Sequence, residues 1–234
     1  MALALAAGLT AEPGNVPDST AEIVSRYLTA SSQAPLREVS QEVEFEARLP
    51  KLKKQGKLHA LRFISKVGQI RYVADQFVGD NSVKKDVIAR YMAAETQAVD
   101  KRKPAETAIT PENYKFKYNG LVEREGQRVH VFQLNPRKKR VGLFKGELWV
   151  DAATYLPVRE AGKLVKTPSI FLKKVEFVRE YEIHDGRAVP KHVQSVINTR
   201  FWGRAELDIN FGNLSPIPGE TNAASHVITV ADFQ

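Results

Sequence analysis

The histidines are the first residues to test for chemistry, because they serve as metal ligands and as general acids or bases near neutral pH. The sequence contains five of them, and no two are spaced as neighbours on one helix face: His59, His130, His184, His192 and His226. A hairpin turn at Asp185-Gly186 would place His184 and His192 on its two arms, but a zinc site needs a third ligand. We therefore interpret this pair as two polar residues of an exposed hairpin.

A serine and a lysine three residues apart, Ser82 and Lys85, match the S-x-x-K spacing of some acyl-serine enzymes. On a helix this spacing would let the amine take the hydroxyl proton. The partner motifs S-D-N and K-T-G are missing, however, and Ser82 also stands where a helix cap is expected. The sequence also lacks the glycine-rich phosphate loops, the G-x-S-x-G elbow and the H-E-x-x-H zinc motif.

Three glutamates, Glu42, Glu44 and Glu46, would share one face of a strand. Paired carboxylates do acid–base work when their surroundings separate their pKa values, but here the pattern indicates the solvated face of an amphipathic strand. The chain contains no cysteine, so it has no thiol nucleophile and no thiolate metal ligand. We predict no catalytic residue, no metal site and no cofactor. A hydrolase on a curved sheet is the least favoured class.

Charge is the unusual feature of the composition. The 234 residues include 35 Lys and Arg against 27 Asp and Glu, a net charge of +8. The basic residues gather in three clusters: Lys51, Lys53, Lys54 and Lys57; Lys101, Arg102 and Lys103; and Arg137, Lys138, Lys139 and Arg140. Such clusters suit an anionic membrane surface or nucleic acid. Ordinary solvated loops are the alternative.

Nucleic acid is disfavoured by the position of the aromatic residues. Tyr114, Phe116 and Tyr118 alternate with Lys115 and Lys117, so the rings would lie on the strand face opposite the lysines. A nucleic-acid-binding strand presents aromatic and basic side chains together. We predict that the rings face inward and that nucleic acid is not a partner.

Hydrophobic periodicity predicts two helices and about ten strands. One helix begins after Ser19 and ends at Pro35, and a second, over residues 83–98, has one apolar stripe. Strands with alternating polarity are expected at 43–49, 58–64, 70–78, 114–118, 128–134, 142–151, 159–166, 175–183, 193–200 and 205–211. Turns are expected at Gln55-Gly56, Val67-Gly68, Asn119-Gly120, Asp185-Gly186 and Gly203.

No parallel β-α-β rhythm is present, so the pattern indicates one antiparallel sheet, mainly β in an α+β fold, in a single domain over residues 19–234. A sheet of this size curls, and the two helices would partly cover its concave face. We expect that face to carry Phe45, Phe63, Tyr72, Phe116, Tyr118, Leu148, Val150, Phe177, Tyr181, Leu207 and Ile209, with Tyr91 and Met92 facing it from the second helix, which would act as a lid. These side chains would line an apolar pocket for acyl chains or simply form a packed core.

Residues 1–18 contain an apolar run, ALALAAGL, without a basic flank. It is similar to the last part of a signal peptide, and a disordered Ala-rich terminus is the alternative. No stretch reaches the roughly 18 apolar residues of a membrane-spanning helix. We expect an exported protein, and the missing cysteine favours a soluble carrier over a lipid-anchored acceptor.

The segment Gly146-Glu147-Leu148-Trp149-Val150-Asp151, followed by Thr154-Tyr155-Leu156-Pro157-Val158-Arg159, resembles a recurring pattern of the LolA/LolB lipoprotein-carrier superfamily. There a strand ending in Trp-x-Asp is followed by a turn and a Leu-Pro-x-Arg strand start. The order of the later strands agrees, and the resemblance covers most of residues 19–214.

The resemblance implies a LolA-like half-barrel with helices as a lid over a hydrophobic cavity. It implies a non-enzymatic, periplasmic protein that binds lipid or the acyl chains of lipoproteins. A protein-interaction or sensor module on the same fold, with a filled core, is the alternative. The ligand, the delivery partner and the oligomeric state are left open.

Overall fold

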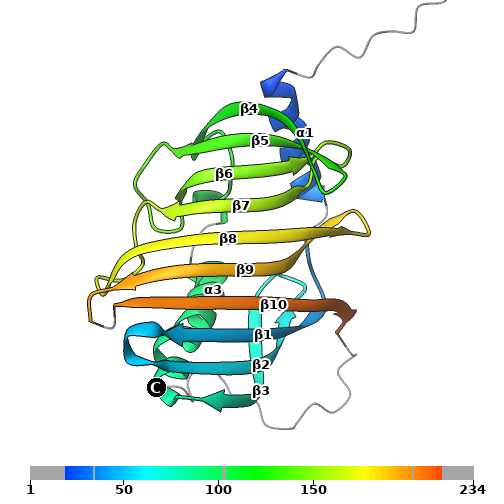
Figure 1. Ribbon diagram of the computed structural model, residues 1–234. Helices are drawn as coiled ribbons and strands as arrows, with labels where there is room; N and C mark the ends of the chain where they lie inside the picture. The colour runs from blue at the N-terminus through cyan, green and yellow to red at the C-terminus, as the bar shows by residue number, and fades with distance from the viewer. Residues whose placement is uncertain (1–18, 34, 102–103, 202, 218–234) are drawn as a thin grey trace, which may run out of the picture.

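The computed structural model describes residues 19–33, 35–101, 104–201 and 203–217. The predicted signal-peptide remnant at 1–18 lies outside these ranges. Ten strands form one antiparallel sheet in the order β3-β2-β1-β10-β9-β8-β7-β6-β5-β4 (Figure 1). The two end strands of this order do not pair with each other, so the sheet is not closed. This confirms the predicted fold: mainly β, with a single curved antiparallel sheet and few helices.

The strands are β1 (Val39–Leu49), β2 (Lys54–Ile64), β3 (Ile70–Gly79), β4 (Tyr114–Arg124), β5 (Gln127–Pro136), β6 (Phe144–Asp151), β7 (Pro157–Leu164), β8 (Leu172–His184), β9 (Arg187–Thr199) and β10 (Arg204–Pro216). The helices are α1 (Thr20–Gln33), α2 (Asn81–Val83), a π-helical turn (Lys84–Ile88) and α3 (Ala89–Lys101), with short 3-10 turns at Pro50–Leu52 and Pro104–Glu106. The segment from α2 to α3 is the predicted lid helix. Among the described residues, no helix is long and apolar enough to cross a membrane.

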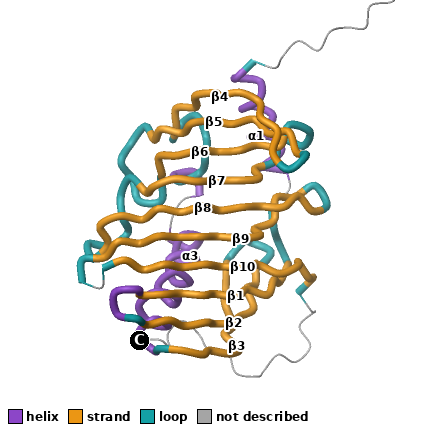
Figure 2. Tube along the Cα trace, in the orientation of Figure 1, coloured by secondary structure: helices purple, strands orange, loops and turns teal. Residues whose placement is uncertain are grey.

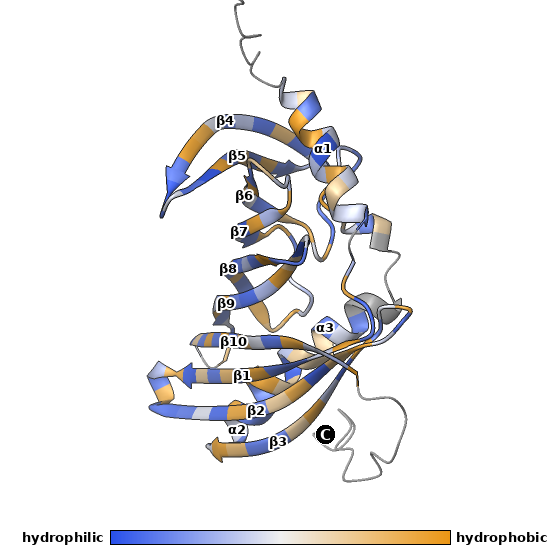
Figure 3. Ribbon diagram, turned by 90° about the vertical axis from the view of Figure 1, so that its right-hand side faces the viewer, coloured by the Kyte–Doolittle hydropathy of each residue, from blue (hydrophilic) through white to orange (hydrophobic). Residues whose placement is uncertain are grey.

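Helix α1 and the α2–α3 segment both lie on the concave side of the sheet (Figure 3). Helix α1 packs on β4–β6, whereas the α2–α3 segment packs on the β1–β3 end and on β9 and β10. The α2–α3 segment belongs to the crossover that carries the chain from β3, at one end of the sheet, to β4 at the other, and Figure 2 shows α3 on the far side of the sheet. The middle of the sheet therefore lies between the two helices.

The caps of the helices differ partly from expectation. Ser19, after which the sequence places the start of the first helix, caps α1: its hydroxyl accepts a hydrogen bond from the Glu22 backbone N–H at 3.2 Å. The Glu22 carboxylate pairs instead with Arg26, so only half of a capping box forms. The residue that caps α2 is Asp80, whose carboxylate accepts from the Ser82 backbone N–H at 2.8 Å and from the Ser82 hydroxyl.

Two predicted turns are misplaced. The first hairpin turns at residues 50–53, and Gly56 lies inside β2, where a Cβ atom would meet the Phe77 ring at 3.0 Å. Asn119 and Gly120 form a β-bulge inside β4, in which Gly120 has φ +112°. The hairpin turns at Glu125-Gly126, whose φ angles of 54° and 78° suit a two-residue turn. The turns at Val67-Gly68, Asp185-Gly186 and Gly203 are where the sequence placed them.

Candidate functional site

The candidate site is the concave face, and one line of cross-strand neighbours describes it best. From β3 to β4, each residue paired with the next, the line reads Phe77, Leu58, Phe45, Ile209, Val193, Arg179, Glu160, Leu148, Phe132 and Tyr118. Directly opposed residues of antiparallel strands project from the same face. The face is therefore apolar at both ends and carries one charged pair, Arg179 and Glu160, near its middle.

The apolar residues form two separate clusters. The first, which we call the β1 cluster, lies under α2–α3; its predicted members are Phe45, Leu207, Ile209, Tyr72 and Met92, with Tyr91 packed against it. The second, the β5 cluster, lies under α1; its predicted members are Leu148 and Val150, with Phe116, Tyr118 and Phe177 packed against it. Tyr181 lies between the two clusters, beside Glu160.

The prediction for Phe63 is wrong. In β2 the buried side chains are Leu58, Ala60, Arg62 and Ile64, and Phe63 projects from the opposite, convex face, where Arg71 lies over its ring at 4.8 Å. The apolar character of Phe63 suggested the concave face, but the alternation of the strand assigns that face to Arg62. A buried arginine is uncommon, so hydropathy alone does not reveal it.

Arg62 joins the sheet to the lid helix. Its Nη2 donates to Glu95 Oε1 of α3 at 2.8 Å, and Tyr72 donates its hydroxyl to the other oxygen of the same carboxylate. Arg62 is 5% exposed, and among the described residues its Nε and Nη1 have no hydrogen-bond partner. Burial, reinforced by the Glu95 charge, raises the pKa of Tyr72 well above its usual value, so the phenol stays a donor.

The central charged pair forms a second polar group on the concave face. Arg179 Nη1 donates to Glu160 Oε2 at 3.1 Å, and the Tyr181 hydroxyl donates to Glu160 Oε1 at 3.0 Å. The Glu160 residue is 8% exposed, whereas the Arg179 side chain is 38% exposed. Burial is the main reason that the pKa of Tyr181 is raised, and the Glu160 charge adds to it.

Strand β8, in the middle of the concave face, is only partly covered. All of its residues are described, and none of them is buried, although β8 lies in the interior of the ten-stranded sheet. The flanking clusters contain side chains that are almost fully buried. Phe177, Arg179 and Tyr181 are therefore partly exposed on the side of the sheet where the helices lie.

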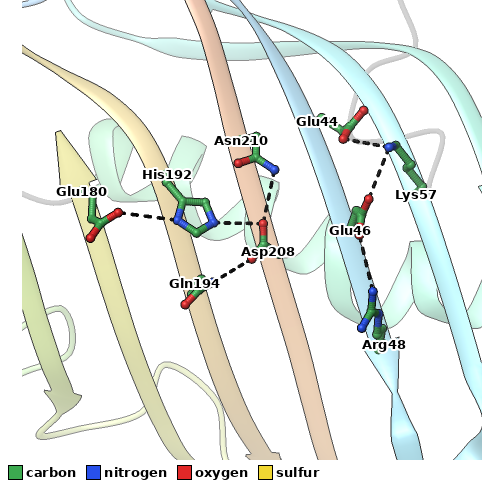
Figure 4. Close-up of polar contacts among 9 residues, drawn as sticks. All are labelled: Glu44, Glu46, Arg48, Lys57, Glu180, His192, Gln194, Asp208 and Asn210. Carbon is green, nitrogen blue, oxygen red and sulfur yellow. Dashed lines mark hydrogen bonds and ion pairs between the residues drawn. The ribbon is translucent and has the colours of Figure 1, made fainter. Parts of the chain in front are cut away.

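The convex face carries ordinary ion-pair ladders (Figure 4). The Lys57 ammonium lies 2.8 Å from Glu44 and 3.3 Å from Glu46, so these acids are a solvated ladder as expected. His192 lies between Glu180 and Asp208, its Nε2 3.0 Å from the Asp208 carboxylate, while His184 opposes Arg187 at the hairpin tip. The structure therefore separates the two histidines, and among the described residues no three potential ligands are placed so that they could hold one metal ion.

Ser82 and Lys85 do not form a catalytic pair in this arrangement. The Ser82 hydroxyl donates to Asp80 and accepts from Lys54 Nζ at 3.2 Å, so it serves the cap of α2. Two hollows lie away from the concave line: one of about 270 Å³ where β1, β2 and β3 meet near Gly56 and Gly79, and one of about 140 Å³ between the π-helical turn and the start of β8. A ligand role for the concave residues remains a prediction.

No protein-family model matches the chain, and no curated protein matches it. Among solved structures, a LolA superfamily protein from Nitrosomonas europaea is similar at 10% identity, covering 85% of this chain and 93% of that one, with a TM-score of 0.36. A DUF1329 family protein from Desulfovibrio piger is similar at 14% identity, covering 91% and 99%, with a TM-score of 0.39. A complex of MucA and MucB from Pseudomonas aeruginosa matches at 12% identity, covering 84% and 98%, with a TM-score of 0.27. At identities of 10–14% and TM-scores below 0.5, these matches are similarities that assign neither a family nor site residues to this chain.

Proposed function

We propose that this protein is an exported, non-enzymatic carrier or binding protein for lipid or for the acyl chains of lipoproteins, which it holds on the concave face of the sheet. The observation that carries the proposal is the partly exposed strand β8 at the centre of the concave face, between two buried apolar clusters. Burying a methylene group contributes about 0.8 kcal/mol, so a chain lying along these clusters is retained without a covalent bond. The α2–α3 segment acts as the lid, with Met92 and Tyr91 on its inner side.

The central test is whether the protein carries lipid. Native mass spectrometry of protein purified from cells is expected to show co-purifying lipid, and the delipidated protein is expected to bind a fluorescent acyl probe. Phe177→Asp, on the concave face, should abolish probe binding, while Phe63→Asp, on the convex face, should retain it. A clean apo mass together with no probe binding overturns the proposal and favours a protein-interaction module on the same fold.

A second part of the proposal concerns an anionic membrane surface. In an antiparallel meander alternate connections lie at the same edge, and the connections 50–53, 137–143, 165–171 and 200–203 share one. These four hairpin connections hold eight basic residues and no acidic one: Lys51, Lys53, Arg137, Lys138, Lys139, Arg140, Lys166 and Arg200. The crossover 80–113 begins and ends at the same edge and holds six basic and six acidic residues. The connections at the opposite edge, 65–69, 125–126, 152–156 and 185–186, hold one basic residue and two acidic ones.

The basic edge, as we call the first set of connections, also exposes apolar side chains. Ile170 and Phe201 are 77% and 66% exposed, and the Phe201 ring lies 5.8 Å from that of Phe171. Basic residues together with exposed apolar tips suit the interface of an anionic bilayer. Two residues of the predicted basic clusters form ion pairs within the protein: Lys54 pairs with Asp80, and Arg140 pairs with Glu106. Arg102 and Lys103 lie outside the described residues.

A further inference from the structure

The two charged residues at the centre of the concave face differ in how many hydrogen-bonding groups they have left for a ligand. Both Glu160 oxygens already accept hydrogen bonds, one from Tyr181 and one from Arg179. Arg179 uses only its Nη1 for these contacts, so its Nη2 and Nε make no hydrogen bond among the described residues. The groups left to bind a ligand at the centre are therefore the cationic N–H donors of Arg179.

The position of Arg179 suits a ligand that is polar at one end. The guanidinium lies over the Phe177 ring at 5.7 Å, and 38% of the Arg179 side chain is exposed. On the β9 side, the cross-strand line continues over three strand spacings, or about 14 Å, through the apolar residues Val193, Ile209 and Phe45. The α2–α3 segment covers these buried side chains, so a ligand chain reaches them when this segment moves aside. On the β7 side, beyond Glu160, the line continues through Leu148 and Phe132.

We propose that Arg179 binds the anionic head group, a carboxylate or a phosphate, of an amphiphile whose apolar chain lies along the concave face. The inference rests on the proposed function and names the ligand class. Guanidinium donors match carboxylate and phosphate oxygens in a bidentate geometry. Glu160 and Tyr181 orient the guanidinium through Nη1 and leave its other donors for the ligand. Burial raises the pKa of Tyr91 on the lid helix, and the charges of Arg179 and Arg62 act against this rise, so both arginines lie near the same phenol.

The test compares two ligands that differ only in the head group. Palmitate and hexadecanol are titrated into delipidated protein, with affinity read by displacement of a fluorescent acyl probe. Wild-type protein is expected to bind palmitate more tightly than hexadecanol. Arg179→Met should weaken palmitate binding by about 10- to 100-fold, the range of a hydrogen bond to a charged group, and leave hexadecanol binding within about twofold.

Two further variants keep the test interpretable. Arg159→Met removes an arginine of the neighbouring strand β7 that contacts Glu147, Glu180 and Trp149 on the convex face, and it should leave both affinities unchanged. Arg179→Met combined with Glu160→Gln avoids an unpaired buried carboxylate and should show the same selective loss of palmitate if the single variant folds poorly.

The outcomes separate the inference from the function on which it rests. Equal affinity of the wild type for the two ligands, or an equal loss of both in Arg179→Met, overturns the head-group site and leaves the carrier function standing. Binding of neither ligand by the wild type overturns both. Inorganic phosphate is expected not to displace the probe. Displacement would mean that the site binds a free anion, and it would overturn the proposal that the ligand is an amphiphile.

Discussion

Arg62 illustrates how a single buried charge ties the sheet to the lid. Its guanidinium is almost fully covered, and its one strong partner is Glu95 of α3, which is also bonded by Tyr72. Removing one member of a buried ion pair costs far more than the pair itself contributes, because the remaining charge is left without compensation.

Glu95→Ala should therefore lower the free energy of unfolding by about 3–5 kcal/mol. Arg90→Ala is the matched control, because it removes an exposed pair with Asp86 on the same helical segment and should cost less than about 0.5 kcal/mol. Urea denaturation followed by circular dichroism measures both variants. Similar small effects for the two would show that Arg62 is compensated by water rather than by Glu95.

At this scale the sequence predicts the apolar members of the site and misses the polar ones. Alternation places Phe45, Leu207 and Ile209 correctly, because their neighbours in the strands are charged or polar. Arg62, Glu160 and Arg179 were not foreseen, since hydropathy assigns charged residues to solvent. Strict alternation through β2, counted from Leu58, assigns Arg62 to the buried face and Phe63 to the opposite face.

At the scale of elements, Asp80 controls where the lid helix begins. Hydrogen bonds from the Ser82 hydroxyl and backbone lower the pKa of the Asp80 carboxyl to about 2, and Lys54 adds to the effect. A carboxyl whose folded pKa is lowered contributes stability above its unfolded pKa, near 3.8, and loses it as the pH falls through its folded pKa.

Asp80→Ala should accordingly lower the urea midpoint of the protein at pH 7, and the difference from the wild type should vanish as the pH falls from about 4 to about 2. Asp80→Asn is the control, since asparagine also caps helices but does not titrate in this range. Its difference from the wild type should be smaller than that of the alanine variant at pH 7. A difference for Asp80→Ala that is constant with pH would contradict the role of the carboxylate.

Strands β6 and β7 approach each other closely through two opposed glycines. A Cβ atom on Gly162 would meet the Lys145 carbonyl oxygen at 2.5 Å and the Phe144 ring at 2.7 Å, and Gly146 lies directly opposite. Phe144 packs edge-on against Phe177 at 5.1 Å between ring centroids. Because Gly146 and Gly162 have no side chains, there is room for the Phe144–Phe177 pair beside Arg179.

Gly162→Ala should destabilise the protein by about 1–3 kcal/mol, the usual cost of overpacking. Gly212→Ala is the comparison, because its Cβ would lie at an ordinary 3.4 Å from Glu42 and the change should stay within about 0.5 kcal/mol. Thermal unfolding of both variants checks the expectation. Equal effects would mean that the strand pair separates easily and that the close approach is not required.

For the whole molecule, local patterns predict the strands but not their order. Alternation and turn residues indicate about ten strands, and the Asp185-Gly186 hairpin follows from two adjacent residues. The pairing of β1 with β10 joins segments about 160 residues apart, as in Phe45 opposite Ile209, and no local signal encodes it. The glycines at 56 and 120 misled the turn assignment because glycine also serves close packing and bulges inside strands.

The order of the strands gathers basic loop residues at one edge of the sheet, and vesicle binding tests whether this edge contacts membranes. The basic edge holds Lys138 and Lys139, both exposed and without an ion-pair partner among the described residues, while Lys66 and Arg187 lie at the opposite edge. We expect the protein to bind vesicles of phosphatidylcholine and phosphatidylglycerol but not of phosphatidylcholine alone. Each basic residue near an anionic surface contributes about 1 kcal/mol. Lys138→Gln with Lys139→Gln should therefore weaken binding by about 10- to 30-fold.

Lys66→Gln with Arg187→Gln changes the net charge equally and tests whether the edge or the total charge matters. This control should bind like the wild type in vesicle co-sedimentation, and binding of both proteins should weaken near 1 M salt, where the screening length falls to about 3 Å. Equal loss in the two double variants would show that the surface senses only net charge. Undiminished binding of the Lys138–Lys139 variant would move the contact away from the basic edge. A selective loss would mean that the protein meets the bilayer with one edge of its sheet, so that the open concave face stands beside the membrane rather than against it.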